Sequence, residues 1–194
     1  MVDIAAGLGQ ISCMAYDLKA SFQNAACYNQ RANQEMFAIL ARLTGRARRR
    51  DVGAWFGSIH GVLNHVIICD INWLRRFRAL DPASTVLSDP CLDPPNLSWK
   101  HDLHEDFNGL QESRVRVDQS LRAWFDAFPA AQYDRVFTYQ DSVGTQREAL
   151  AGQAFEFLFL HQIHHRGQVS QILDTLGLPN NWGDNGAYLE GPAD

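Results

Sequence analysis

The sequence has no apolar run long enough to cross a membrane. A spanning helix takes about 20 consecutive apolar residues, and the longest uninterrupted stretches here, such as residues 66–69, have the length found in protein cores. Lysine and arginine are absent from residues 1–10, so no charged segment precedes an apolar block as in a signal peptide. We therefore expect a cytoplasmic protein that has no membrane partner.

Basic charge is also scarce. The chain has 17 lysines and arginines against 22 acidic residues, for a formal net charge of −5. Nucleic-acid-binding domains usually carry a basic stripe or patch, so we expect no nucleic-acid partner. One basic cluster, Arg46, Arg48, Arg49 and Arg50, has the composition of a phosphate or anionic-lipid contact. The favoured interpretation is a solvated loop between helices.

Cysteines are few and widely spaced, at positions 13, 27, 69 and 91. Without a C-x-x-C pair the sequence offers neither a cysteine-rich zinc site nor a dithiol redox motif. We interpret the four as reduced, mostly buried thiols. With 194 residues, 46% of them hydrophobic, the chain excludes disorder and needs no disulfide or metal merely to fold.

Four segments carry apolar residues at helical spacing, and no long strand pattern is present. They are residues 20–43, 56–80, 103–128 and 146–176, followed by stop signals at Gly45, Pro82, Pro129 and Gly177. We predict an all-α fold, an antiparallel up-down four-helix bundle forming a single domain over residues 1–194. Residues 1–19 would be an N-terminal extension and residues 179–194 an irregular tail.

Two connections carry their own signals. Residues 81–99 hold four of the seven prolines and predict a loop long enough to cross from one end of the bundle to the other. Residues 135–145 combine a β-prone pentad with turn residues, which predicts a short β-hairpin across the bundle. The competing signal is Thr145-x-x-Glu148, a capping box that would open the fourth helix at about Gln146.

The chemistry is concentrated in residues 161–168, His-Gln-Ile-His-His-Arg-Gly-Gln. Positions four apart on a helix lie nearly one above the other, and His161 and His165 fall within the apolar stripe of the fourth segment. Two inward imidazoles one turn apart can bind one metal ion. The alternative is a pair of hydrogen-bonded core histidines. Burying two unpaired rings costs several kcal/mol in total, which favours the metal.

A third ligand should come from a neighbouring helix. In the second segment His60 lies opposite the apolar stripe and is expected to face solvent, whereas His65 lies on its flank. The candidate site is therefore His65, His161 and His165, three nitrogens with an open fourth position as in catalytic zinc sites. A divalent ion is implied, with zinc or nickel favoured and iron, manganese and copper also compatible.

Several nearby positions break the apolar pattern. Asp70 lies within a stripe and needs a partner, either an arginine such as Arg166 or Arg114 or a ligating imidazole. Arg114 interrupts the seam of the third segment, where it is expected to extend its head to solvent. Gly167 predicts close approach of another backbone. Cys69, one turn after His65, is interpreted as a small buried hydrophobe rather than a thiolate ligand.

A series of short motifs runs along most of the chain. They are Tyr28–Asn33, Trp55–Ile59, Leu63–Ile67, Asp70, Trp73-Leu74, Arg76-Phe77, Tyr139–Gly144 and His161–Val169. With these motifs in this order the sequence resembles the DinB family, the DinB/YfiT-like metal-dependent bundle proteins. It departs from the family pattern at Leu160, where an asparagine is expected. A leucine cannot make the hydrogen bond by which that asparagine would support the metal ligands.

The resemblance implies an up-down four-helix bundle, commonly a homodimer, with three histidines on one divalent metal at His65, His161 and His165. Characterised relatives include thiol S-transferases and a mycothiol-dependent isomerase. The resemblance therefore predicts a metal-dependent enzyme of the S-transferase type that acts on a small molecule. In such an enzyme the metal activates a low-molecular-weight thiol. A metal-dependent hydrolase and a non-catalytic metal-binding dimer are the alternatives.

Overall fold

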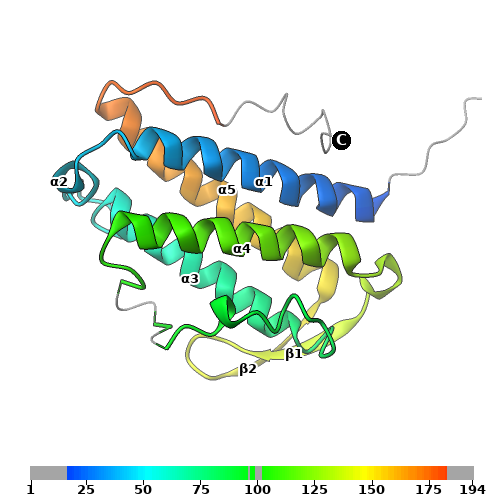
Figure 1. The fold of residues 1–194 in the computed structure, drawn as a ribbon. Helices are drawn as coiled ribbons and strands as arrows, with labels where there is room; N and C mark the ends of the chain where they lie inside the picture. The colour runs from blue at the N-terminus through cyan, green and yellow to red at the C-terminus, as the bar shows by residue number, and fades with distance from the viewer. Residues whose placement is uncertain (1–16, 96, 99–101, 183–194) are drawn as a thin grey trace, which may run out of the picture.

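The computed structural model describes residues 17–95, 97–98 and 102–182, and they are mostly helical (Figure 1). The helices are α1 (Leu18–Leu40), α2 (Gly45–Arg48), α3 (Ile59–Phe77), α4 (Phe107–Ala127) and α5 (Ala151–Thr175), with short 3-10 turns η1 (Pro90–Leu92) and η2 (Ala130–Gln132). Strands β1 (Val136–Gln140) and β2 (Gln146–Leu150) form a two-stranded antiparallel sheet. The four helical segments expected from the sequence are confirmed: α1 begins two residues earlier than predicted and ends three earlier, and the other three helices lie within their predicted ranges.

Three of the long helices begin at a side chain that caps their first turn. Asp17 accepts hydrogen bonds from two amides at the start of α1, Ser58 accepts from the Gly61 amide in α3, and Asp106 accepts from the Gly109 amide in α4. Such caps satisfy amides that lack a partner within the helix. In α3 the cap places the first turn three residues later than the apolar pattern predicts.

The long helices pack in four neighbouring pairs: α1 lies against α4 and α5, and α3 lies against the same two helices. The predicted up-down alternation is wrong between α3 and α4, which run in the same direction (Figure 1). Asp70 pairs with Arg114 near the middle of both helices, and Phe77 stacks on Trp124 near the end of both. The connection that contains the proline-rich loop returns the chain to the end where α3 began.

The hairpin prediction is confirmed, and the capping box at Thr145 is not used. Residues 146–150 form β2, paired with β1 from Val136↔Leu150 to Gln140↔Gln146. The Asp141 carboxylate accepts hydrogen bonds from the amides of Val143 and Thr145 and so fixes the turn. Helix α5 therefore begins only at Ala151.

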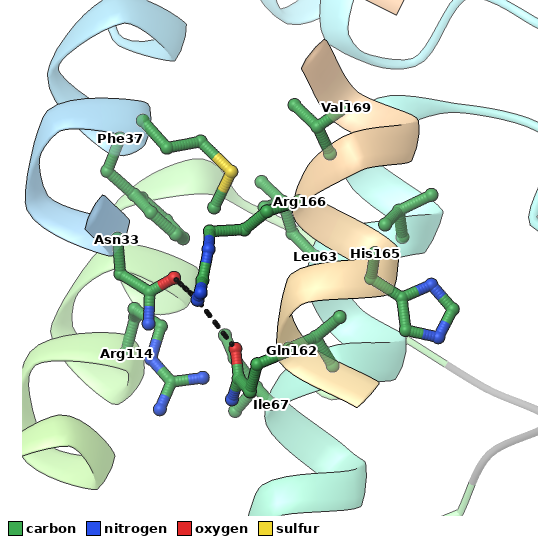
Figure 2. A pocket seen from close by; sticks show the side chains of 12 residues that line it. Asn33, Phe37, Leu63, Ile67, Arg114, Gln162, His165, Arg166 and Val169 are labelled. Atoms are coloured by element: carbon green, nitrogen blue, oxygen red, sulfur yellow. Dashed lines mark hydrogen bonds between the residues drawn. The ribbon is translucent and has the colours of Figure 1, made fainter. Parts of the chain in front are cut away.

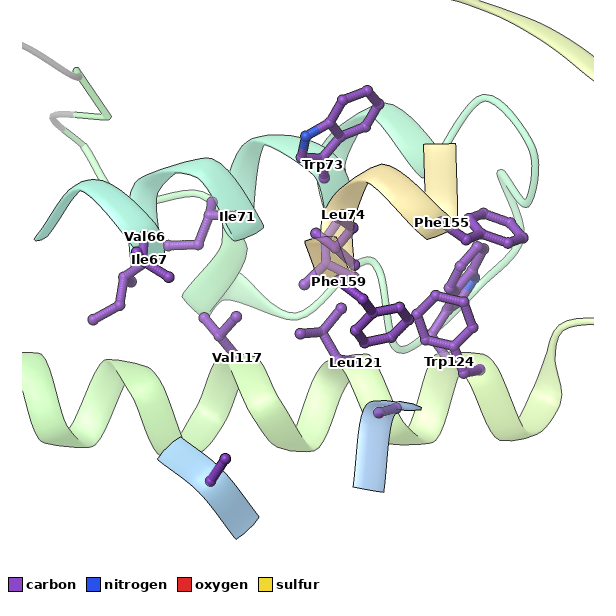
Figure 3. Packing of buried hydrophobic residues seen from close by; sticks show 14 of the residues in the cluster. Val66, Ile67, Ile71, Trp73, Leu74, Val117, Leu121, Trp124, Phe155 and Phe159 are labelled. Atoms are coloured by element: carbon purple, nitrogen blue, oxygen red, sulfur yellow. The ribbon is translucent and has the colours of Figure 1, made fainter. Parts of the chain in front are cut away.

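The core lies between the long helices and is rich in aromatic rings (Figure 3). Trp124 stacks on Phe77 and on Phe128, with centroid distances of 4.9 and 4.6 Å, and Phe155 of α5 meets their edges. Stacked and edge-to-face pairs add to the free energy of apolar burial. They hold α3 and α5 in contact at the end of the molecule nearest the hairpin.

Among the described helices, none has both the length and the apolar character of a membrane span.

Two connecting regions differ from their predictions. The basic cluster is not simply a loop, because Arg46 and Arg48 lie in α2, and the Arg48 guanidinium sits 4.1 Å from the centre of the Phe107 ring. The start of the predicted tail packs on the core: Trp182 is buried, and its carbonyl accepts a hydrogen bond from the Tyr28 hydroxyl. The rest of the tail, and most of the predicted N-terminal extension, lie outside the described residues.

Candidate metal centre

The three predicted histidines come together where α3 packs against α5. The Nε2 atom of His161 lies 3.2 Å from Nε2 of His65 and 3.0 Å from Nε2 of His165. The three rings meet with centroid distances between 4.3 and 5.2 Å. One turn of α5 thus supplies two of the imidazoles, and the facing helix supplies the third.

These distances suit a shared ion. Two nitrogens bound to one tetrahedral zinc at about 2.05 Å lie about 3.3 Å apart. A neutral imidazole has one donor and one acceptor nitrogen. Three Nε2 atoms that face one another therefore cannot all be paired by hydrogen bonds among the three rings. A cation between them accepts all three lone pairs at once. The residues therefore fit a divalent metal.

The surroundings keep the three imidazoles uncharged. Burial, assisted by the neighbouring histidines, lowers the pKa of His65, His161 and His165 to about 4 in each case. A metal ligand must be the neutral ring, because protons and metal compete for the same lone pair. The site is thus prepared for a cation at neutral pH without first losing protons.

Neighbouring side chains orient the rings. The Gln168 side-chain oxygen lies 2.8 Å from Nδ1 of His165, so Nδ1 donates to it and Nε2 keeps the free lone pair. Phe56 stacks on His65 with a centroid distance of 4.0 Å and meets His165 edge-on. Nδ1 of His161 is buried and has no hydrogen-bond partner among the described residues.

A buried polar network lies behind the histidines and holds α5 in place (Figure 2). Gln162 and Arg166 each directly follow a candidate ligand, and both point toward α1 and α4, while the His165 ring lies on the other side of α5. Gln162 donates to the Asp70 carboxylate, and Arg166 donates to the side-chain oxygens of Asn29 and Asn33. Since the next residue on a helix is rotated by about 100°, fixing Gln162 and Arg166 also fixes the direction of His161 and His165.

The charges in this network are balanced. Arg114 pairs with Asp70 and, at 2.9 Å, with Asp118, and all three side chains are less than 5% exposed. Burial raises the pKa of Asp118 to about 6, while the Arg114 guanidinium opposes the rise. With Arg166 the network contains two carboxylates and two guanidinium groups. A cavity of only ≈ 10 Å³ lies beside it, too small for a substrate.

Five individual expectations are tested by this geometry. The arginine partner of Asp70 is confirmed as Arg114, and the expectation that Arg114 reaches solvent is wrong. His60 is not a surface residue: it is 3% exposed and meets the His104 carbonyl. No other group lies within 4 Å of a Cβ built at Gly167, so close backbone approach is not its role. Cys69 is partly buried at the edge of the histidine cluster.

Sequence comparison identifies the family of the chain. The model of the DinB family matches residues 16–193. The chain belongs to the DinB family. It is 22% identical over 162 residues to the protein DinB of Bacillus subtilis (strain 168), covering 84% of this chain and 90% of that protein. No solved structure matches the chain significantly. The family match extends through residues 179–193, which the sequence motifs alone did not reach.

Sequence reasoning missed the supporting role of several residues around the histidines. Phe56 lies in the segment before α3, and Gln168 lies one turn after His164 on α5. Asn29 and Asn33 are polar positions four apart on the inner face of α1, a signal that could have indicated a buried polar partner. Their amide groups donate to Asp118. The sequence could not identify Asp118 as their partner, because the contact forms only when α1 packs against α4.

Proposed function

We propose that this DinB-family chain is a divalent-metal-dependent enzyme in which His65, His161 and His165 hold the ion. The observation that carries the proposal is the convergence of three Nε2 atoms from two helices. The four long helices serve as a bundle scaffold in one domain, and the polar network fixes the ligand-bearing faces of α3 and α5. A set of three histidines is typical of catalytic sites, which keep a coordination position for water or substrate.

The reaction proposed is thiol-dependent S-transfer, as the family resemblance implies. A divalent ion in this site would lower the pKa of a thiol that coordinates it and so supply a thiolate at neutral pH. The chain's own part is to keep three neutral imidazoles oriented, through Gln168 at His165 and Phe56 at His65. The acidic net charge of −5 supports a small-molecule substrate rather than a nucleic acid.

A hydrolase is less well supported, because it needs a general base near the ion. Asp70 is the carboxylate closest in sequence to His65, and it is fully buried and already paired with Arg114 and Gln162. Among the described residues, the group of metal-binding type next to the histidines is instead a thiol. The same group of side chains fits a non-catalytic metal site equally well.

Metal analysis of untagged protein tests the site directly. We expect His65→Ala, His161→Ala and His165→Ala each to lose most of the bound metal, because two remaining imidazoles bind weakly. His164→Ala is the matched control: His164 lies on the same helix, is exposed, and contacts Gln168 and the His165 ring. Equal metal content in all five proteins would contradict the proposed site. Metal-dependent turnover with a panel of thiols and electrophiles then tests the reaction.

A homodimer is also proposed. Phe157, Leu160 and Ile163 lie at intervals of three along α5 and are 52, 63 and 52% exposed. Apolar groups gathered on one exposed face are typical of interaction surfaces. Leu160, where the family pattern has asparagine, therefore belongs to this outer face. A second copy of the chain is the proposed occupant.

A further inference from the structure

An open cleft lies against the C-terminal end of α3, where the hairpin crosses that helix (Figure 1). Its volume of ≈ 550 Å³ falls within the range of about 300–1,000 Å³ that is common for small-molecule sites. Two of the sequence motifs, Arg76-Phe77 and Tyr139–Gly144, supply residues that line it. Neither motif contributes to the metal centre, so the cleft is a second candidate site.

Three arginines from the end of α3 line the cleft: Arg75, Arg76 and Arg78. Two of them share one carboxylate, since Arg78 donates to Asp93 at 2.8 and 3.0 Å and Arg75 lies 3.4 Å from it. Arg76 forms no ion pair with a carboxylate among the described residues. The helix end thus presents one positive group whose charge the described part of the chain leaves without an anionic partner.

The guanidinium of Arg76 is held in a defined position. Its Cζ atom lies 4.7 Å from the centre of the Trp73 ring and 5.0 Å from that of Tyr139, and its Nε donates to the Gln140 carbonyl at 3.1 Å. A guanidinium has five N–H groups, and the four on its terminal nitrogens make no hydrogen bond to a described residue. Such a pair of nitrogens binds an oxyanion through two parallel N–H···O bonds.

The surroundings make a bound anion favourable for Arg76. Burial lowers the pKa of its guanidinium, so the folded chain disfavours the charge. The carboxylate that lines the cleft, Asp141, is already engaged: it accepts hydrogen bonds from the amides of its own turn and from Nε of Arg147 at 3.0 Å. An anion that enters from solvent would therefore stabilise the positive charge of Arg76.

We propose that this cleft binds a small organic molecule through a single carboxylate group, with Arg76 as its partner. Asn72, Thr138 and Ser142 also line the cleft and offer an amide and two hydroxyl groups to the polar part of such a molecule. A carboxylate is favoured over a phosphate dianion, because the carbonyls at the C-terminal end of a helix carry partial negative charge and because only one guanidinium is left to balance the ligand.

The site does not depend on the metal centre. Arg76 lies eleven residues after His65, which corresponds to about 16 Å along the axis of α3. The carboxylate site can therefore be present whether or not the histidines hold an ion. Benzoate binding to His65→Ala should equal that of wild-type protein, so a failure of the proposed function would leave this inference standing.

Equilibrium dialysis of the full-length chain tests the cleft with matched probes: butyrate and benzoate, each compared with its uncharged amide, butyramide or benzamide. We expect at least one of the two acids to bind more than about 10-fold more tightly than its amide, because the bonds to the charged group are lost in the amide. Arg76→Gln should abolish this preference. Arg76→Lys should weaken binding of the acid by about fivefold, since lysine keeps the charge but not the paired N–H groups.

A second pair of variants leaves Arg76 in place, because Arg76 also holds the hairpin against α3. Ser142→Glu brings a negative charge into the cleft and should weaken binding of the acid by at least about fivefold, because like charges repel. Val143→Glu is the matched control. It adds the same charge at the next residue, which is 78% exposed and does not line the cleft, and it should bind like wild-type protein.

Three results would overturn the proposal. Neither acid might bind in preference to its amide, or Arg76→Gln might retain wild-type affinity for the acid; in both cases Arg76 does not recognise a carboxylate. Inorganic phosphate that binds more tightly than both acids would show instead that the cleft is a phosphate site. A preference for the acids that is lost in Arg76→Gln, reduced in Ser142→Glu and kept in Val143→Glu supports the carboxylate site.

Discussion

At the scale of single residues, the chain buries three imidazole rings that are not needed to stabilise the fold. The core is built from apolar side chains and stacked aromatic rings, as expected for a chain of 194 residues. Three neutral imidazoles pressed together add no comparable stabilisation, and Nδ1 of His161 has no partner among the described residues. Unpaired buried polar atoms cost free energy. Such a cost is typical of a functional site.

The depressed histidine pKa values predict how the metal-free protein responds to acid. The pKa of each of the three falls from 6.5 in an exposed chain to about 4 when folded. Between these values the unfolded state binds more protons, so the free energy of unfolding falls as pH is lowered through this window. Above pH 6.5 these residues contribute no pH dependence.

Urea denaturation of the metal-free protein at several pH values from about 7.5 to about 4.5 measures this effect. His161→Leu should reduce the slope, because it removes one of the three groups. An unfolding free energy that His161→Leu leaves with the wild-type pH dependence would show that burial does not depress the pKa of His161.

At the scale of helices, two glycines that look alike in the sequence have opposite roles. A Cβ at Gly61, in the first turn of α3, would collide with the carbonyl oxygen of Phe56, whereas at Gly167 it would meet nothing within 4 Å. We expect Gly61→Ala to destabilise the protein by about 1–3 kcal/mol and to move Phe56 away from His65. Gly167→Ala should stabilise it by about 1 kcal/mol, the helix propensity gained over glycine. Thermal unfolding of both variants checks the two signs, and a stabilised Gly61→Ala would contradict the contact.

The sequence predicts helices well here because their signals are local. Apolar spacing places the long helices, and a helical stripe selects His161 and His165 on one face. The fate of residues 146–150 depended on tertiary contacts instead: Tyr139 packs on Trp73, and Phe137 on Phe77, so the hairpin is held against α3. The capping box at Thr145 is a local sequence signal, so it cannot predict that these contacts place residues 146–150 in a strand. Arg114 was misplaced for the same reason, because Asp70 of α3 becomes its partner only once α4 lies parallel to α3.

At the scale of the whole molecule, the polar network ties all four long helices to one another. Asn29 and Asn33 of α1 and Asp70 of α3 contact the Arg114–Asp118 pair of α4. Arg166 of α5 joins them by donating to Asn29 and Asn33. Removing one member of such a network leaves a buried charge without its partner. The same contacts that fix the helix arrangement therefore fix the two faces that carry the histidines.

The proposed homodimer gives the last prediction. Leu160 and Ile163 are 63 and 52% exposed on α5, outside the network and the core. A stable interface buries about 800 Å² on each partner, and charged groups at its apolar centre oppose association. We expect light scattering coupled to gel filtration to find a dimer for wild-type protein and a monomer for the Leu160→Glu, Ile163→Glu double variant. Val143→Glu, which changes a 78% exposed apolar residue in the hairpin turn, should remain dimeric. A double variant that stays dimeric, with unchanged helix content, would place the interface on another face.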